Sequence, residues 1–167
     1  MSDRGLMHCR YCRYSGKGDA VKSKDTRKDV VRLLEDGVKE ETDNNLVKHN
    51  ASRELATAYL NAGDLDKALQ YANIDLAMRP NNIDANELAA WIYYLKGDYN
   101  NAKMHADKML ATKTGNAATW YKAGAIALGA GEIEKGNQMM RDALTSNPYI
   151  DQRTINETRQ PLTVTKL

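Results

Sequence analysis

Apolar residues recur with helical spacing along much of the chain. Leu55, Ala56 and Tyr59 stand at i, i+1 and i+4, which is the spacing of one face of an α-helix. After a break at Gly63, a second stripe of the same kind runs through residues 65–76. The pattern predicts two amphipathic helices joined by a tight turn.

The break between the two stripes occurs three times. Gly63, Gly97 and Gly131 recur at one constant interval along the chain. Glycine readily adopts the left-handed conformation that ends a helix, and an acidic residue suits the N-terminus of the next one. The residues that follow the three glycines are Asp64, Asp98 and Glu132. The spacing therefore predicts three copies of one helical hairpin.

The period divides residues 49–150 into three units, 49–82, 83–116 and 117–150. Small residues occupy matching positions in all three, so the two helices of each hairpin can approach closely. These positions hold Ala56, Ala90 and Gly124 in the first helices, and Ala68, Ala102 and Gly136 in the second. One hairpin cannot bury its apolar face alone, and the units are expected to stack. The third unit is the richest in glycine, and we expect it to be the least stable.

The segments on either side of the units are predicted to cap the array. Residues 25–48 form a capping helix, expected over Asp25–Asn44. Residues 1–24 form a basic, partly ordered segment that includes an eroded first hairpin helix over Leu6–Tyr14. Residues 151–167 form a short capping helix and a frayed tail. Terminal units of such arrays are atypical because one of their faces must meet water.

The repeat resembles the tetratricopeptide repeat (TPR), a helix–turn–helix unit whose length equals the interval between the three glycines. The resemblance covers residues 49–150. The matching residues are Leu55, Ala56, Tyr59, Gly63, Ala68 and Pro80 in the first copy, Ala90, Tyr93, Gly97, Asp98, Tyr99 and Ala102 in the second, and Trp120, Gly124, Gly131, Ala143, Leu144 and Pro148 in the third. The resemblance implies an all-α fold, a right-handed superhelical α-solenoid of TPR hairpins with flanking capping helices. It also implies that the first helices of the hairpins line a concave surface.

Positions one period apart on the first helices would stack into rows on that surface. We therefore predict an aromatic patch of Trp91, Tyr94 and Tyr121, because aromatic residues edged by charges are typical of protein-binding hot spots. The alternative is that Trp91 packs between hairpins as core. The predicted groove residues are Arg53, Thr57, Leu60, Glu87, Trp91, Tyr94, Tyr121 and Lys122.

Composition and charge do not suggest a polyanionic partner. The 167 residues carry a formal net charge of +2. Residues 1–28 hold eight basic and three acidic residues and so carry +5, which leaves −3 for the rest. We interpret the basic segment as a solvated face of the cap and expect no specific nucleic-acid partner. The chain has no glycine-rich phosphate loop and no H-E-x-x-H or G-x-S-x-G motif, so neither an enzyme nor a cofactor is predicted.

Cys9 and Cys12 form a CxxC pair beside His8. A structural zinc site needs four ligands, and His49 and His105 are isolated from the pair in the sequence. A redox pair would be expected near a βαβ unit, which this helical pattern lacks. We therefore predict no metal site and interpret the thiols as incidental. A metal or redox module on these weak candidate ligands is kept as an alternative.

The longest strongly apolar run, Ala89–Leu95, is far shorter than the roughly 20 residues that span a bilayer. Residues 1–24 contain no apolar core of a secretory signal, so a cytoplasmic protein without membrane insertion is expected. The sequence predicts a non-catalytic scaffold that binds a protein or peptide in its concave groove. The alternative is a self-associating module that stacks through its terminal hairpins. The chain also fits the end of a longer array.

Overall fold

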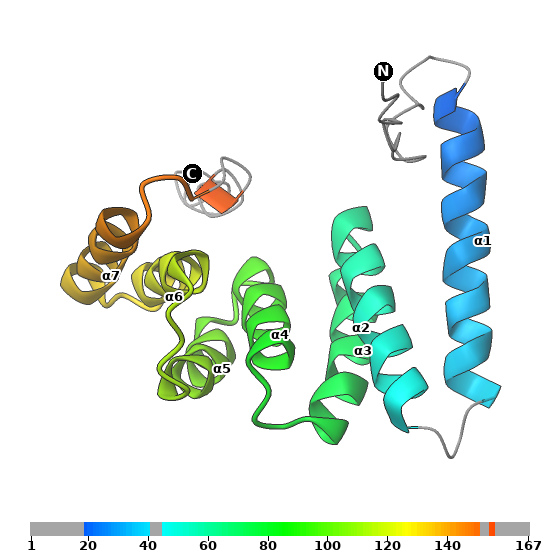
Figure 1. Ribbon diagram of the computed structural model, residues 1–167, viewed down its shortest axis with the longest axis horizontal. Coiled ribbons are helices and arrows are strands. Elements are labelled where there is room, and N and C mark those ends of the chain that lie inside the picture. Colours follow the sequence, from blue (N-terminus) through cyan, green and yellow to red (C-terminus); the bar gives the residue numbers. More distant parts are fainter. Residues whose placement is uncertain (1–18, 41–44, 151–153, 156–167) are drawn as a thin grey trace, which may run out of the picture.

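The computed structural model describes residues 19–40, 45–150 and 154–155, and within these ranges every regular element is helical. The helices are α1 (Asp19–Glu40), α2 (Asn45–Ala62), α3 (Leu65–Met78), α4 (Ile83–Leu95), α5 (Tyr99–Ala111), α6 (Ala117–Gly129) and α7 (Ile133–Ser146). Figure 1 shows them side by side in chain order along a curved path, from α1 at one end to α7 at the other. Helices α2 and α3, α4 and α5, and α6 and α7 form three antiparallel hairpins.

Each hairpin turn is closed by its glycine. Gly63, Gly97 and Gly131 have φ angles of 80°, 76° and 86°, the left-handed conformation expected from the sequence. In the first turn, Gly63 N donates to Leu60 O at 3.1 Å and Asp64 N donates to Tyr59 O at 3.0 Å. The other two turns repeat both bonds at the equivalent positions. These bonds satisfy the last carbonyl groups of each first helix.

The acid after each glycine meets the second helix in two different ways. Asp64 and Asp98 each accept a hydrogen bond from the backbone N–H three residues later, at 3.1 Å in both cases. Glu132 makes no such bond and instead pairs with Lys103 at 3.4 Å and Lys135 at 3.0 Å. A longer side chain fits the cap geometry less well, because helix N-caps favour short acceptors. Lys135 is the main cause of the lowered pKa of Glu132.

The small residues at the hairpin contacts are packed tightly, as the sequence predicts. Ala56, Ala68 and Ala102 are fully buried. Helices α6 and α7 lie close together at Gly124 and Gly136, where a methyl group on Gly136 would lie 2.7 Å from the Gly124 carbonyl oxygen. The glycines therefore allow a closer helix approach in the third hairpin than alanine would.

A ring contact between the two helices recurs in the first two hairpins. Tyr59 and Tyr71 stack with ring centroids 5.7 Å apart, and Tyr93 and His105, at the equivalent positions of the second unit, stack at 5.6 Å. The third hairpin has Ala127 and Met139 at these positions, and both belong to the buried core. The equivalent inter-helix position is thus occupied by two tyrosine rings in the first unit, by a tyrosine and a histidine ring in the second, and by two apolar side chains in the third.

The flanking helix begins and ends earlier than predicted. The expected helix covers Asp25–Asn44, whereas α1 covers Asp19–Glu40 and α2 already begins at Asn45. Lys22 and Lys24 are good helix formers, and Asp19 supplies the negative charge that a helix N-terminus favours. The helix predicted over Leu6–Tyr14 lies outside the described residues, as does nearly all of 151–167.

Helix α1 is joined to the first hairpin through Glu35. Its Oε1 accepts hydrogen bonds from the hydroxyls of Tyr59 at 2.6 Å and Tyr71 at 3.2 Å. The bond from Tyr59 is the main cause of the lowered pKa of Glu35. The pKa of each tyrosine is raised to about 12, for Tyr59 chiefly by this hydrogen bond and for Tyr71 chiefly by burial. One carboxylate therefore connects three helices.

Candidate functional site

The first helices of the hairpins form an inner layer. Helix α2 contacts α4, and α4 contacts α6, in addition to the contacts that each makes within its hairpin. In Figure 1, α4 and α6 lie on the upper side of the curved path and α5 lies below them. Because helices on the inner side of a curved array are the closest together, α2, α4 and α6 line its concave side. All of the predicted groove residues lie on these three helices.

The predicted aromatic patch is buried. Trp91, Tyr94 and Tyr121 are only 5%, 1% and 4% exposed. Trp91 stacks on Tyr94 with ring centroids 4.9 Å apart, and burial raises the pKa of Tyr94 to about 12. The prediction of an open patch is therefore wrong for these rings, and the alternative that Trp91 packs as core is the one observed. The physical reason is that successive inner helices touch, so large side chains between them fill the contact.

Tyr121 is covered from the C-terminal side of the array. It belongs to a small apolar cluster with Ala117, Ala143 and Ile150, against which Ile155 also packs. Tyr121 therefore supports the end of the array.

The structure brings Glu87, Trp91 and Lys122 together between α4 and α6. Lys122 Nζ lies 3.0 Å from Glu87 Oε1 and 5.9 Å from the centre of the Trp91 ring. The hydroxyl of Thr119 donates to the other carboxylate oxygen of Glu87 at 2.7 Å. The side chains of Glu87 and Lys122 are 24% and 20% exposed, so this pair forms a polar face over the buried rings.

The predicted residues on α2 make their polar contacts locally. The Thr57 hydroxyl donates to the carbonyl of Arg53 at 3.0 Å, and the Arg53 guanidinium lies 3.5 Å from Glu54. About a third of the Arg53 side chain is exposed. Leu60 is partly buried and packs against the apolar clusters of the first and second hairpins. Arg53 and Thr57 thus offer polar groups on the inner helix next to the one that carries Glu87.

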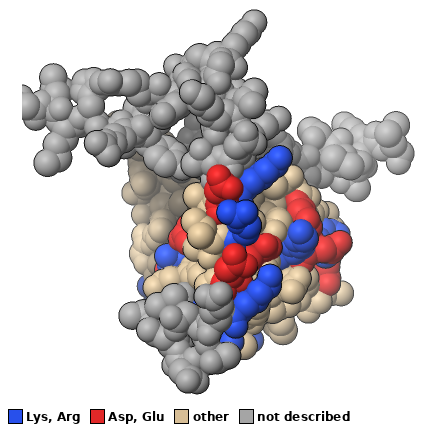
Figure 2. All heavy atoms as spheres, turned by 90° about the vertical axis from the view of Figure 1, so that its right-hand side faces the viewer, with Lys and Arg blue, Asp and Glu red and all other residues tan. Residues whose placement is uncertain are grey.

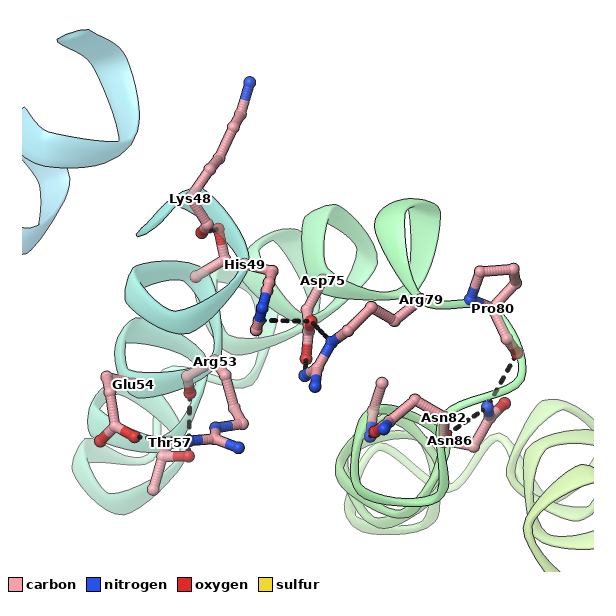
Figure 3. A network of polar contacts seen from close by, with 12 residues as sticks. Lys48, His49, Arg53, Glu54, Thr57, Asp75, Arg79, Pro80, Asn82 and Asn86 are labelled. Atoms are coloured by element: carbon pink, nitrogen blue, oxygen red, sulfur yellow. Dashed lines mark hydrogen bonds and ion pairs between the residues drawn. The ribbon is translucent and has the colours of Figure 1, made fainter. Parts of the chain in front are cut away.

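A buried polar cluster lies within the first hairpin, and sequence reasoning missed it (Figure 3). Asp75 is fully buried and accepts two hydrogen bonds from the Arg79 guanidinium, at 2.8 and 2.7 Å. His49 Nδ1 faces the same carboxylate at 3.9 Å. A signal was available: Asp75 stands in the apolar stripe of α3, at the position that Met109 and Ala143 occupy in the other units.

A second polar group, around Asn86, ties the linker after α3 to the second hairpin. The Asn86 amide nitrogen donates to Pro80 O at 2.9 Å and to Asn82 O at 2.8 Å. Trp120, at the equivalent position of the third unit, makes a similar bond from its ring nitrogen to Thr114 O at 2.7 Å. The same repeat position thus ties each of these inner helices to the carbonyl of the linker before it.

The amide orientation of Asn86 fixes the tautomer of His105. Since the amide nitrogen serves two carbonyls, the oxygen of Asn86 faces His105 Nδ1 at 3.0 Å and accepts from it. In neutral His105 the proton therefore lies on Nδ1, and a second proton would have to bind Nε2. His105 is 7% exposed, and burial is the main cause of its lowered pKa, with Lys108 adding to the effect.

The protonation of His105 should make folding stability depend on pH. The unfolded residue titrates near 6.5, and its pKa in the fold is lower, so the unfolded state binds more protons as the pH falls. The stabilisation is fully present above about pH 6.5 and is lost below it. Urea midpoints measured from pH 7.5 to 5 should fall in the wild type and fall less in His105→Gln. Equal slopes in both proteins would contradict this assignment.

A shallow hollow in the described residues lies away from the predicted groove. It is between α5 and the third hairpin and is lined by Lys103, Leu110, Ile126, Glu132 and Met139 among others. Over the described ranges no group of three or more His, Cys, Asp or Glu side chains is placed to hold a metal ion. His8, Cys9 and Cys12 fall outside those ranges. None of the helices described is long and apolar enough to cross a membrane.

Comparison with solved structures finds the same fold in MamA. A crystal structure of MamA superposes with a TM-score of 0.67 at 17% sequence identity, covering 87% of this chain and 82% of the MamA chain. A fragment of MamA from Desulfovibrio magneticus RS-1 gives 0.66 at 20% identity, covering 86% and 78%. No protein-family model and no curated protein matches the sequence. The likeness establishes the fold, and the predicted all-α solenoid is confirmed.

Proposed function

We propose that this chain is a non-catalytic TPR scaffold with three repeats over residues 49–150, which binds a protein or peptide along its inner helices. The proposal is supported by the inner layer of α2, α4 and α6 and by the likeness to the MamA fold. The observation that carries it is the partly exposed Glu87–Lys122 pair held over Trp91. Such a surface offers charges of both signs on a rigid apolar base.

The binding face consists of polar groups supported by buried rings. Arg53 and Thr57 on α2 and Glu87 and Lys122 on α4 and α6 are the groups that a partner would meet. Leu60, Trp91, Tyr94 and Tyr121 hold the helices that carry them, so their role is positional. Replacing the rings would damage the fold before it tested binding, since large-to-small changes in a core cost about 3–5 kcal/mol for an aromatic side chain.

The polar face is tested by charge reversal. A phage-displayed peptide library is selected on the wild-type protein, and the dissociation constant of a selected peptide is measured by isothermal titration calorimetry. The double variant Arg53→Glu/Lys122→Glu should weaken binding at least about tenfold, equivalent to about 1.4 kcal/mol.

The matched control is Lys108→Glu/Arg141→Glu, which makes the same change in net charge at exposed positions of the second helices α5 and α7. Its affinity should stay within about twofold of the wild type. Circular dichroism and thermal unfolding establish that both variants fold. Equal losses of affinity in the two variants would argue against the inner face, and so would a library that yields no binder.

Self-association is the second candidate function. It is favoured by exposed apolar side chains on α1, where Val30 and Leu33 are 48% and 67% exposed. If sedimentation velocity shows only monomer at high protein concentration, self-association is excluded.

A further inference from the structure

Two of the inner helices carry a charged residue at the same position of the repeat. These residues are Arg53 on α2 and Glu87 on α4. Glu87 is held by the next inner helix, α6, where Lys122 Nζ lies 3.0 Å from one of its carboxylate oxygens and the Thr119 hydroxyl donates to the other at 2.7 Å. The charge of Glu87 is therefore compensated within the protein.

Arg53 lacks the equivalent partners on its own neighbouring inner helix. The positions of α4 that correspond to Thr119 and Lys122 hold Ala85 and Leu88, whose side chains cannot accept a hydrogen bond. Ala85 is buried, and Leu88 packs against an apolar cluster of the first two hairpins. Along α4, which the structure describes in full, no carboxylate pairs with Arg53.

Within α2 the Arg53 guanidinium makes one weak contact. One of its nitrogens lies 3.5 Å from a carboxylate oxygen of Glu54, the next residue in the helix, whose side chain is 58% exposed. Consecutive residues of a helix point in different directions, and an exposed pair contributes little. Asp75, the buried acid of the same hairpin, binds Arg79 through both carboxylate oxygens. Arg53 therefore keeps most of its N–H donors for another group.

Several exposed lysines differ from Arg53 because a carboxylate on another turn or another helix contacts them directly. Lys96 pairs with Asp66, and Lys103 pairs with Asp107 at 2.9 Å. At the α1 end of the molecule, Figure 2 likewise shows basic and acidic side chains next to one another. Arg53 thus stands out on the inner face as a cation with little compensation from the protein.

The Thr57 hydroxyl does not add a donor to this place. Figure 3 shows Arg53, Glu54 and Thr57 next to one another on α2. The hydroxyl already donates its proton to the carbonyl of Arg53 at 3.0 Å. Any anionic group that binds here therefore depends on the guanidinium of Arg53.

From this arrangement we infer that Arg53 binds the side-chain carboxylate of an acidic residue of the partner, at the α2 end of the inner face. The inference rests on the proposed peptide-binding function and adds the chemistry of the partner and the residue that recognises it. A guanidinium can bind a planar carboxylate through two parallel N–H···O bonds, which a lysine cannot reproduce. Lys122 is already paired with Glu87, so it is assigned no acid of the partner.

The test uses peptides selected from the phage-displayed library and synthesised with an amidated C-terminus, so that side chains supply their only carboxylates. Each aspartate or glutamate of a selected peptide is replaced in turn by its amide, and dissociation constants are measured by isothermal titration calorimetry. For one acidic residue, Arg53→Gln should weaken binding of the parent peptide at least about fivefold. The same variant should bind the amide-substituted peptide within about twofold of the wild type.

Three control variants isolate the role of Arg53. Thr57→Val removes a hydroxyl from the same face, and Lys122→Gln removes the other cation of the inner face. Both should keep the preference for the acidic peptide over its amide form. Arg141→Gln changes an exposed arginine of α7 that also contacts a neighbour in its own helix, Gln138 at 3.0 Å, and should bind both peptides like the wild type. Circular dichroism establishes that each variant folds.

The outcomes separate the inference from the function on which it rests. An acid preference that is lost in Arg53→Gln and kept in the three controls supports the assignment. Selected peptides without an acidic residue, or an acid preference that survives Arg53→Gln or is lost equally in Lys122→Gln, overturn the inference and leave peptide binding standing. A library that yields no binder overturns both.

Discussion

Asp75→Asn is expected to lower the free energy of unfolding by about 2–4 kcal/mol, measured by urea denaturation followed by circular dichroism at pH 7. The carboxylate is fully buried and holds the Arg79 guanidinium by two hydrogen bonds. An amide of the same shape keeps one acceptor oxygen and loses the negative charge. The largely buried Arg79 guanidinium would then be left without its counter-ion. The Arg79 side chain is 22% exposed, which limits the loss because water can reach part of it.

The control is Asp66→Asn on the same helix. Asp66 pairs with Lys96, but its side chain is 89% exposed, and an exposed ion pair contributes at most about 1 kcal/mol. If Asp66→Asn lowered the free energy of unfolding as much as Asp75→Asn does, burial of the carboxylate would not be the cause of the destabilisation.

A second variant tests the pairing itself. In the second unit, Met109 occupies the position of Asp75 and is 1% exposed, so an apolar side chain fits this place in the repeat. Asp75→Met/Arg79→Met should therefore recover much of the stability lost in Asp75→Asn, since a buried ion pair can often be replaced by apolar residues without loss. A double variant no more stable than Asp75→Asn would contradict this account.

Gly136→Ala is expected to destabilise the third hairpin although alanine is the better helix former. The new methyl group would lie 2.7 Å from Gly124 O and 2.7 Å from Leu128 Cγ, so α6 and α7 would have to move apart. Overpacking of this kind costs about 1–3 kcal/mol, against a gain of about 1 kcal/mol from helix propensity. The net loss, up to about 2 kcal/mol, is measured by chemical denaturation of the full chain.

The control for this variant is Gly37→Ala in α1, where a methyl group would meet nothing within 4 Å. It should stabilise the protein by about 0.5–1 kcal/mol, because only the propensity effect remains. Gly124→Ala/Gly136→Ala should lose less than the sum of the single variants, since helices already separated by one methyl group accommodate the second. A stabilising Gly136→Ala would mean that the close approach is not needed.

The repeat and its turns could be predicted because they depend on local chemistry. Three consecutive copies of the repeat each place a glycine at the end of one helix and an acid at the start of the next. The positive φ angles of Gly63, Gly97 and Gly131 agree with the left-handed conformation predicted from this pattern. The burial of Trp91 could not be predicted in the same way. Whether an inner residue faces solvent or the next helix depends on the rotation between hairpins, which is set by many contacts together.

The polar network illustrates a second limit. Asn86 and His105 are far apart in the sequence and meet only because α4 and α5 are antiparallel, so neither residue indicates the other in the sequence. Asp75 was different: an acid within an apolar stripe, four residues before an arginine, is an anomaly that the pattern itself displays. Positions at which one repeat unit differs in residue type from the other two are therefore the most informative positions in this chain.

The bonds from Asn86 to Pro80 O and from Trp120 to Thr114 O have a consequence for cooperativity. Each one couples a hairpin to its predecessor, so the three hairpins open as linked neighbours and not independently. Ser52 occupies the equivalent position in α2 but donates to Lys48 O within its own helix. The first hairpin therefore lacks this coupling at its own start, and its connection to α1 is made instead by Glu35 with Tyr59 and Tyr71.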